Sequence, residues 1–307
     1  MSTMEIPKQI KGKRVREILK RVNTSVSFEF FPPKTEESAQ ALYENIEKLV
    51  PLNPTFVSVT YGAGGTTRKL THELVLKIRK MTGLTVVPHL TCVGSTRDEI
   101  YEIVGKYREV GITDILALRG DPPKGQKDYV PEKDGFPYAT DLITFIKREF
   151  PDMGIGAACY PEGHKDTPNR LTELDYLKEK VDAGVDYLTT QMFFDNHEFY
   201  DFKARCDFWK IDVPIIAGIM PITTRDSMKR MADLSPGTRV PAGLLEAIHR
   251  VPDEKVYNVG IHWAAQQVFD LLAYDVDGIH FYTLNRCRPT IEIYKNLGLV
   301  NSNPLLE

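Results

Sequence analysis

The chain contains few cysteines, and they form no recognisable cluster. Its 307 residues include only four, Cys92, Cys159, Cys206 and Cys287, and no two of them make a C-x-x-C pair. Disulfide-dependent secreted domains and zinc-binding modules both need closely spaced cysteines, so the sequence argues against both classes. We therefore expect reduced thiols and a cytoplasmic location.

Long apolar runs and an excess of one charge are also missing. No apolar stretch is long enough to cross a bilayer, and a net charge of −3 gives no general attraction to nucleic acids or anionic membranes. Residues 8–21 are basic but lack the apolar core of a secretory signal, and Glu5 and Glu17 argue against a mitochondrial presequence. We expect no membrane and no nucleic-acid partner, and we interpret the basic segment as a solvated first helix.

Several common catalytic motifs are absent as well. There is no P-loop and no nucleophile elbow. The His72-Glu73 pair lacks the second histidine of a zinc-binding helix, and the histidines and cysteines show no metal-ligand spacing, so we predict no metal site. Gly62-Ala63-Gly64-Gly65 begins like a dinucleotide-binding fingerprint, but Thr67 stands where the last glycine is required. We interpret that stretch as a flexible loop.

The sequence does contain a regular alternation of short β-rich runs and longer amphipathic runs. Eight runs predict strands: Ser25–Phe30, Thr55–Thr60, Thr85–Leu90, Asp114–Leu118, Gly154–Cys159, Asp186–Thr190, Val213–Gly218 and Gly278–Thr283. The first four begin about thirty residues apart, the length of one βα unit. Eight such units predict a (β/α)8 TIM barrel with an extra N-terminal helix, as a single domain over residues 1–307. A doubly wound sheet is the alternative, but no complete dinucleotide fingerprint supports it.

Helical patterns lie between the predicted strands. They cover Glu36–Val50, Lys69–Met81, Thr96–Val110, Arg170–Asp182, His197–Phe208 and Lys255–Tyr274. Thr96 and Glu99 have the spacing of a capping box, which predicts a helix start. The gap before the last strand is longer than the others, so we expect an extra helix or lid around Ser235–Arg250. The sixth predicted strand carries no lysine, which argues against a Schiff-base aldolase.

The segment Ser27–Pro33 is the most informative part of the chain. It places Glu29 at the end of an apolar strand and then stops the strand with two prolines. Because strand residues alternate between faces, Ser25, Ser27 and Glu29 share one face, and the aromatic residues flanking Glu29 share the other. In a barrel, Glu29 then lies at the carboxyl-end rim, where barrel enzymes keep their catalytic groups. Taken alone, a strand-end glutamate is more often a structural ion-pair partner.

Other predicted strands also end in polar residues. These include His89, Arg119, Asp121, Tyr160, His164, Gln191 and Arg286. A concave polar site needs polar groups from many strands at one rim, whereas stability alone does not. Each has a structural alternative: His89 as a core histidine, Arg119 paired with Asp121, Gln191 closing a barrel hydrogen bond. These residues alone predict a barrel enzyme and do not specify its reaction.

Taken in order, the strand-end segments resemble those of the methylenetetrahydrofolate reductase family. The matching segments are Ser25–Pro33, Phe56–Ala63, Pro88–Cys92, Ala117–Asp121 and His280–Arg286, so the resemblance covers nearly the whole chain. It implies a (β/α)8 barrel that holds FAD at its carboxyl-end face. It also implies reduction of 5,10-methylenetetrahydrofolate to 5-methyltetrahydrofolate, in one-carbon metabolism and methionine biosynthesis. The chain ends soon after the eighth unit and is similar to the short, single-domain form, without a C-terminal regulatory domain.

The resemblance also implies which residues bind cofactor and substrates. FAD would be bound by Thr60, Tyr61, Ala63, His89, Arg119, Gly120, Asp121, Ala139, Tyr160 and His164, with Lys180 near its diphosphate end. Folate would be bound by Glu29, Asp121, Gln191 and Arg286. NADH or NADPH would supply the hydride in a ping-pong reaction, and a homo-oligomer is expected. The chain departs from some relatives at Glu173, Tyr176 and Glu179, and at Ser227, where others have a folate-contacting glutamine.

Two catalytic roles follow from this resemblance. The five-membered ring of the substrate must open to an iminium before it accepts a hydride, and the leaving nitrogen then needs a proton. We expect Glu29 to be that general acid and Asp121 to tune the flavin and hydrogen-bond the pterin. The alternatives are another FAD-dependent barrel oxidoreductase related to proline dehydrogenase, and a folate- or flavin-binding protein without turnover.

Overall fold

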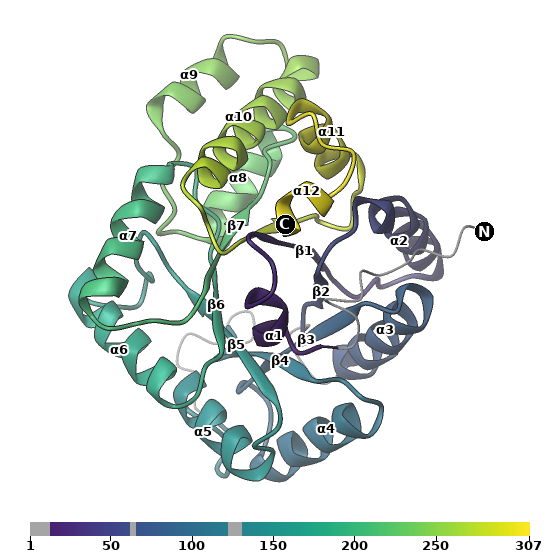
Figure 1. Cartoon of the computed structure of the whole chain (residues 1–307), viewed down its shortest axis with the longest axis vertical. Helices are drawn as coiled ribbons and strands as arrows, with labels where there is room; N and C mark the ends of the chain where they lie inside the picture. The colour runs from purple at the N-terminus through teal and green to yellow at the C-terminus, as the bar shows by residue number, and fades with distance from the viewer. Residues whose placement is uncertain (1–12, 62–65, 122–130) are drawn as a thin grey trace.

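Eight parallel strands close into a barrel (Figure 1). The computed structural model describes residues 13–61, 66–121 and 131–307. Each strand pairs with the next in sequence, and β8 pairs with β1. The strands are β1 (Ser25–Phe30), β2 (Phe56–Val59), β3 (Thr85–Thr91), β4 (Asp114–Leu118), β5 (Gly154–Cys159), β6 (Tyr187–Thr190), β7 (Ile215–Ile219) and β8 (Gly278–Tyr282). The predicted (β/α)8 barrel is confirmed, and every strand lies within two residues of its predicted bounds.

Helices surround the barrel. They are α1 (Val15–Leu19), α2 (Glu36–Leu49), α3 (Thr66–Thr82), α4 (Arg97–Glu109), α5 (Ala139–Glu149), α6 (Arg170–Asp182), α7 (Asn196–Phe208), α8 (Arg225–Leu234), α9 (Ala242–His249), α10 (Asp253–Ala273), α11 (Arg288–Asn296) and α12 (Asn303–Leu306), with a short 3₁₀ turn η1 (Val50–Leu52). Side-chain caps mark the starts of α2, α4, α6, α7 and α8. The predicted capping box of α4 is present, since Thr96 Oγ1 accepts from Glu99 N–H and Glu99 Oε2 accepts from Thr96 N–H. Helix α9 lies inside the segment where an extra helix was predicted.

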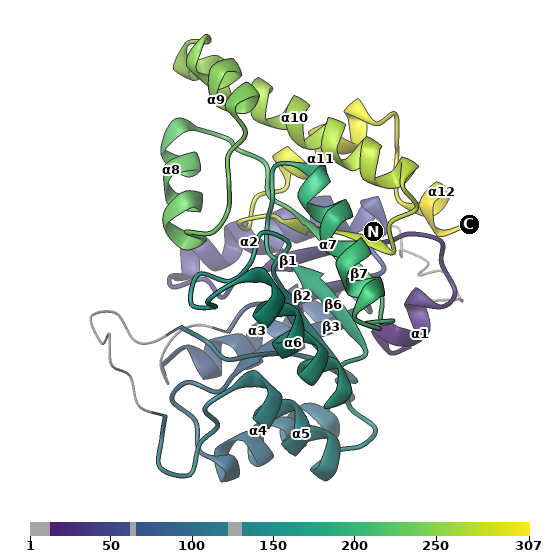
Figure 2. The same ribbon diagram turned by 90° about the vertical axis from the view of Figure 1, so that its left-hand side faces the viewer.

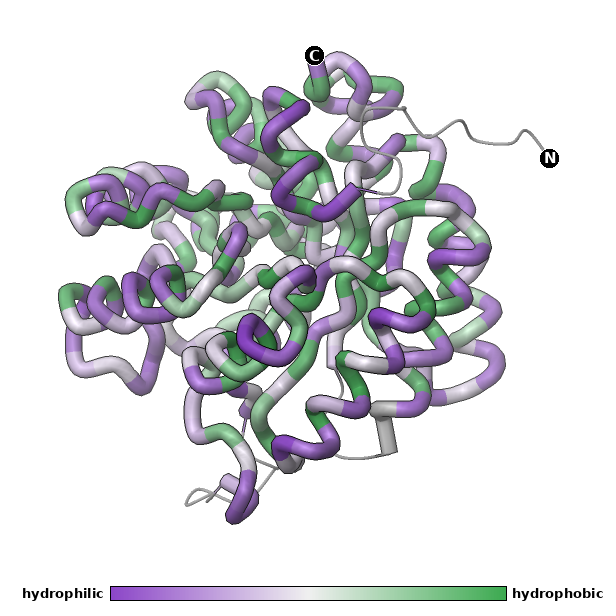
Figure 3. Tube along the Cα trace, turned by 60° about the horizontal axis from the view of Figure 1, so that its bottom comes forward, coloured by the Kyte–Doolittle hydropathy of each residue, from purple (hydrophilic) through white to green (hydrophobic). Residues whose placement is uncertain are grey.

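The alternation along β1 separates two layers of the core. Phe28 packs against Phe281 of β8, with ring centroids 6.0 Å apart, and both belong to the large cluster that includes Leu42 and Ile46 of α2. These aromatic residues therefore point outward under the helices, as the sequence predicts. Hydrophobic and hydrophilic stretches alternate along the surrounding helices (Figure 3), because each presents one face to the barrel and one to solvent.

A second, smaller apolar cluster fills the inside of the barrel near the amino ends of the strands. It joins Phe56, Val87, Leu116, Tyr187 and Ile216 from five strands with Val15 of α1. Helix α1 lies across this end of the barrel (Figure 2), and its first amide N–H donates to Asp114 Oδ1 at 3.1 Å.

Helix α1 therefore covers the inner cluster at the amino end of the barrel. This corrects the interpretation of a solvated first helix: Val15 and Ile18 are completely buried, because they cover the inner cluster.

The four cysteines are buried free thiols, which confirms the expectation of reduced cysteines. Burial raises the pKa of the Cys206 thiol to about 12, so it stays protonated at neutral pH. Across residues 13–61, 66–121 and 131–307, no helix combines the length and apolarity needed to cross a membrane.

Candidate active site

Glu29 lies near the end of β1 with two histidines around one of its oxygens. Its Oε2 atom is 3.5 Å from His89 Nε2 of β3 and 3.7 Å from His280 Nε2 of β8. The Glu29 side chain is 18% exposed, whereas the His280 side chain is only 3% exposed. Glu29 is therefore the solvent-facing member of a buried carboxylate–imidazole cluster, as a group that must reach a substrate would be.

Burial determines the charge of His89 in this cluster. It lowers the pKa of His89; the Glu29 carboxylate opposes that effect and His280 adds to it. His89 is therefore a neutral imidazole at neutral pH. Burial also raises the pKa of Tyr282 far above its ordinary value, with the Glu29 carboxylate as the next cause. The Tyr282 hydroxyl donates to the carbonyl oxygen of Thr190 at 2.6 Å, so it helps to hold β8 against β6.

Glu29 and His89 were predicted from the sequence as site residues, whereas their neighbours His280 and Ser27 were not. Ser27 Oγ lies 2.7 Å from His280 Nδ1 inside the barrel. The signal was available, since Ser27 shares the inward face of β1 with Glu29. What the sequence could not provide was the register of the closing strand pair, in which Ser27 lies opposite His280.

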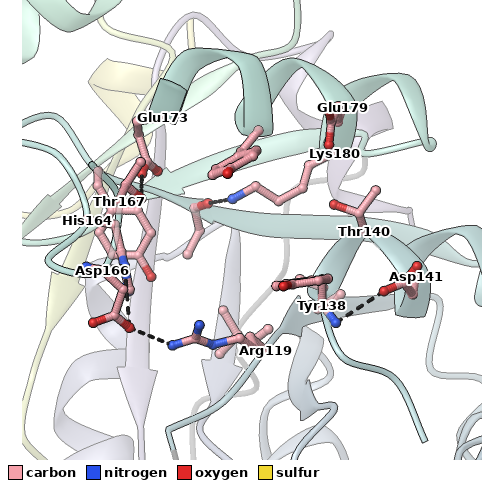
Figure 4. A pocket seen from close by; sticks show the side chains of 16 residues that line it. Arg119, Tyr138, Thr140, Asp141, His164, Asp166, Thr167, Glu173, Glu179 and Lys180 are labelled. Atoms are coloured by element: carbon pink, nitrogen blue, oxygen red, sulfur yellow. Dashed lines mark hydrogen bonds and ion pairs between the residues drawn. The ribbon is translucent and has the colours of Figure 1, made fainter. Parts of the chain in front are cut away.

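A cleft of about 660 Å³ lies between the carboxyl ends of β4 and β5, the start of α5 and one face of α6 (Figure 4). This volume is in the range of small-molecule and cofactor sites. Five residues expected at the cofactor line it: Arg119, Ala139, Tyr160, His164 and Lys180. The structure therefore brings together side chains that come from two successive βα units, β4–α5 and β5–α6.

The cleft contains two cations held by different kinds of partner. Arg119 Nη2 donates to Asp166 Oδ2 at 2.9 Å, and this hydrogen bond lowers the pKa of the Asp166 carboxyl. Lys180 Nζ donates to the carbonyl oxygen of Ala158 at 3.0 Å. Burial lowers the pKa of Lys180, while the carboxylate of Glu173 opposes that effect. The structural alternative of an Arg119–Asp121 ion pair is wrong, because Asp166 is the partner of Arg119.

Carboxylates and aromatic rings complete the cleft. The buried Glu173 accepts from Thr167 Oγ1 at 2.6 Å. The rings of Tyr160 and His164 meet edge to face, with centroids 4.7 Å apart. Burial lowers the pKa of His164, so this imidazole is also neutral at neutral pH. Glu179 and Tyr176 of α6 line the same cleft, so the three positions on α6 at which this chain departs from some relatives all belong to this site.

The other described residues that were expected at the cofactor do not line this cleft. Tyr61 lines a separate groove of about 330 Å³ with residues of α3 and α4, and Thr60 follows β2, where its N–H donates to Phe30 O.

Gly120 has a φ of +83°, and a Cβ there would lie 2.9 Å from Thr91 Cβ, so this turn requires glycine. Asp121 is exposed directly after it. Ala63, with the glycine-rich stretch 62–65, lies outside the described residues.

Two of the four expected folate residues, Gln191 and Arg286, lie just after β6 and β8. Gln191 is half-buried, and its Oε1 accepts from the Met192 N–H at 2.9 Å. Arg286 is exposed after Leu284 and Asn285, which both have positive φ and turn the chain sharply after β8. Ser227, at the position of a glutamine in some relatives, caps helix α8 by accepting from Thr224 N–H.

The comparisons with known proteins agree on one family. The family model for methylenetetrahydrofolate reductase matches residues 14–298. The methylenetetrahydrofolate reductase (NADH) 1 of Arabidopsis thaliana is 38% identical over 304 residues, which are 95% of this chain and 51% of that protein. The 5,10-methylenetetrahydrofolate reductase of Escherichia coli is 41% identical over 277 residues, which cover 90% of this chain and 91% of that one. The chain thus spans about half the length of its plant relatives and nearly all of the bacterial one.

Solved structures support the barrel fold. A Clostridium thermocellum protein described as binding two copies of 5-methyl-5,6,7,8-tetrahydrofolic acid has a TM-score of 0.67 at 17% identity, over 92% of this chain and 98% of that one. An oxaloacetate acetylhydrolase has a TM-score of 0.53 at 11% identity, over 95% and 89%. Such low identities concern the fold alone. Together, the family model and the bacterial relative establish that this chain belongs to the methylenetetrahydrofolate reductase family.

Proposed function

We propose that this protein reduces 5,10-methylenetetrahydrofolate to 5-methyltetrahydrofolate, with FAD bound at the barrel rim and NADH or NADPH as the electron source. The observation that carries the proposal is the partly exposed carboxyl of Glu29, which lies beside two buried imidazoles at the carboxyl end of a barrel of this family. A site for binding alone would not need an acid there. The plant relatives are named as NADH enzymes, so NADH is the first donor to test.

The residues of the 660 Å³ cleft fit an adenine dinucleotide. Arg119 and Lys180 supply the donors that a pyrophosphate needs, and the carboxylate of Glu173 is suited to ribose hydroxyls. The buried Nε2 atom of His89 has no hydrogen-bond partner among the described residues, as expected for a polar atom that a ligand completes. We infer that Tyr160, His164 and Ala139 line the same FAD site.

When bound, FAD supplies the hydride chemistry, accepting a hydride from a nicotinamide and passing one to an electrophilic carbon. The protein must then orient the substrate and deliver a proton. We propose that the Glu29 carboxyl protonates the leaving nitrogen as the five-membered ring opens. Gln191 and Arg286 are proposed to bind folate, Arg286 through the carboxylate of the glutamate tail. The exposed Asp121 is proposed to hydrogen-bond the pterin.

Nicotinamide and folate would both bind at the carboxyl-end rim of the barrel, and this determines the order in which they bind. If nicotinamide and folate use the same face of the cofactor, they bind in turn and the kinetics are ping-pong. We also retain three predictions from the sequence: a single catalytic domain, a homo-oligomer and a cytoplasmic location.

Colour and flavin identity test this proposal directly. The purified protein should be yellow, release FAD on denaturation, and lose its colour when NADH or NADPH is added without oxygen. Recovery of only FMN, or of no flavin after reconstitution, would overturn the cofactor assignment. Bound FAD that neither nucleotide bleaches would instead favour a binding protein without turnover.

A further inference from the structure

Two exposed tyrosines line the 660 Å³ cleft, one from each of the helices that border it. Tyr138 directly precedes α5, and Tyr176 lies in the second turn of α6. Tyr138 is 63% exposed and Tyr176 is 50% exposed. Figure 4 shows Tyr138 on the α5 side of the cleft, across from Lys180 and Glu179 of α6. Two large rings in one cleft are thus accessible to a ligand.

Neither of these two rings is stacked on another group. Tyr101 of α4 is equally exposed, at 50%, but its ring packs against Phe150, with centroids 5.0 Å apart. Within the described parts of the chain, no aromatic ring and no cation packs on the ring of Tyr138 or Tyr176. Exposed apolar surface that gathers in one cleft is typical of a binding site, and a flat aromatic ligand is the partner that such rings favour.

Both rings are attached to backbone that is already fixed. The N–H of Tyr138 donates to Asp141 Oδ2 at 3.2 Å. Its carbonyl oxygen accepts from the Leu142 N–H at 3.3 Å and from Cys92 Sγ at 3.4 Å. Tyr176 lies in the interior of α6. Binding a ligand therefore requires little ordering of the chain, which lowers the entropic cost of the contact.

Helix α6 places Tyr176 between the two groups proposed to hold ribose and pyrophosphate. Glu173, Tyr176 and Lys180 are spaced by three and four residues, so they share one face of the helix, and all three line the cleft. Seven residues of helix span about 10 Å. An adenosine diphosphate group bound by Glu173 and Lys180 is therefore within reach of the Tyr176 ring.

The topology of the barrel indicates which end of the cofactor belongs at these rings. In the closed ring of eight strands, β5 lies opposite β1 (Figure 1). The reacting end of the flavin must come close to Glu29 on β1, whereas Tyr176 is on α6, the helix that follows β5. The α5–α6 side of the cleft therefore suits the adenosine end of FAD and not the isoalloxazine.

We propose that Tyr138 and Tyr176 bind the adenine ring of FAD by aromatic stacking and so make the site selective for the dinucleotide over FMN, which has no adenine. This inference rests on the proposed function, which assigns FAD to this cleft. Tyr176 is one of the positions at which this chain departs from some relatives, so the contact is a property of this chain.

Titration of the apoprotein with FAD, ADP and FMN tests the two ends of the cofactor separately. ADP carries the adenine without the isoalloxazine, and FMN carries the isoalloxazine without the adenine. Tyr138→Leu and Tyr176→Leu should each raise the dissociation constants for FAD and ADP about fivefold to fiftyfold, the effect of losing one stacked ring. The dissociation constant for FMN should stay unchanged. Tyr138→Phe and Tyr176→Phe, which keep the ring, should bind all three like wild type.

Tyr101→Leu is the matched control, because Tyr101 is as exposed as Tyr176 but does not line the cleft. It should bind FAD, ADP and FMN like wild type. If the leucine variants bind ADP like wild type, or if they lose as much affinity for FMN as for ADP, the adenine contact is wrong. If wild type itself takes up no FAD, the cofactor assignment of the proposed function fails instead, and the ADP titration still tests the two rings.

Discussion

At the scale of single residues, the site contains charged side chains whose roles can be tested by substituting them one at a time. Lys180 is the buried cation of the cleft, donating to Ala158 O beside Glu173. We expect Lys180→Met to raise the dissociation constant for FAD about tenfold to hundredfold, since a charge-assisted hydrogen bond is lost. Titration of the apoprotein with FAD measures this.

A matched control for Lys180 lies on the same helix. Lys178 pairs with Asp182 and does not line the cleft, so Lys178→Met should bind FAD like wild type. If both variants weaken FAD equally, the effect comes from helix α6 as a whole. Lys180 would then have no specific role at the cofactor.

The residues that sequence reasoning found and missed differ in a physical way. Glu29 and Arg119 were identified because each lies at the end of a strand with its own local pattern, whereas Lys180 was identified only through the family resemblance. His280 and Ser27 interact across 253 residues, and their contact depends on how the first and last strands align when the barrel closes. Asp166 was likewise missed as the partner of Arg119, since it lies in the irregular segment after β5 and no strand periodicity points to it.

At the scale of elements, the contact between α1 and β4 makes stability depend on pH. Burial raises the pKa of Asp114 from its ordinary value of 3.8 to about 6. The folded state therefore keeps a proton that the unfolded state loses, so this contribution to stability is present below pH 3.8 and is lost as the pH rises through about 6. The difference between these values corresponds to about 3 kcal/mol.

Asp114→Asn should remove this dependence. The amide keeps an oxygen for the Val15 N–H and cannot ionise, so the variant should be about 2–3 kcal/mol more stable than wild type at pH 8 and nearly equal at pH 4. Urea unfolding at several pH values measures the difference. Asp152→Asn is the control, because Asp152 is exposed and pairs with Arg108 at the surface. A gain for Asp114→Asn that is the same at every pH would contradict the account.

Glycines in β5 and α4 offer a second test at this scale. A Cβ at Gly156 would lie 2.5 Å from Cζ of the fully buried Tyr187, whereas a Cβ at Gly105 meets nothing within 4 Å. Gly156→Ala should therefore destabilise the barrel by about 1–3 kcal/mol, and Gly105→Ala should stabilise it by about 0.5–1 kcal/mol. Urea midpoints decide this; a wild-type midpoint for Gly156→Ala would show that the barrel interior can adjust.

The elements themselves were the most predictable feature of the chain. Strand alternation in Ser25–Phe30 and the capping box of Thr96 and Glu99 are local signals, and the structure contains both. The position of α1 could not be predicted, because a basic segment with few apolar residues does not indicate which part of the molecule it covers. Its location depends on the inner cluster, which forms only when five strands from different units come together.

At the scale of the whole molecule, the barrel separates two tasks. At the amino end, α1 packs on the inner apolar cluster and stabilises the barrel. The cleft and Glu29 lie at the carboxyl end. This separation means that the two halves of the proposed reaction can be examined separately. Reduction of the flavin by NADH needs the cleft but no proton for folate, whereas reduction of methylenetetrahydrofolate needs the proton from Glu29.

Stopped-flow measurement of both half-reactions in wild type and Glu29→Gln tests the central claim most directly. The glutamine keeps the size of the side chain but cannot donate the proton. The variant should bind FAD and be bleached by NADH at a near-normal rate, yet be reoxidised by methylenetetrahydrofolate at least about a hundredfold more slowly. Reoxidation by menadione, which needs no ring opening, should be normal. Fast reoxidation by methylenetetrahydrofolate would show that another group is the acid, and loss of flavin or stability would show that Glu29 is structural.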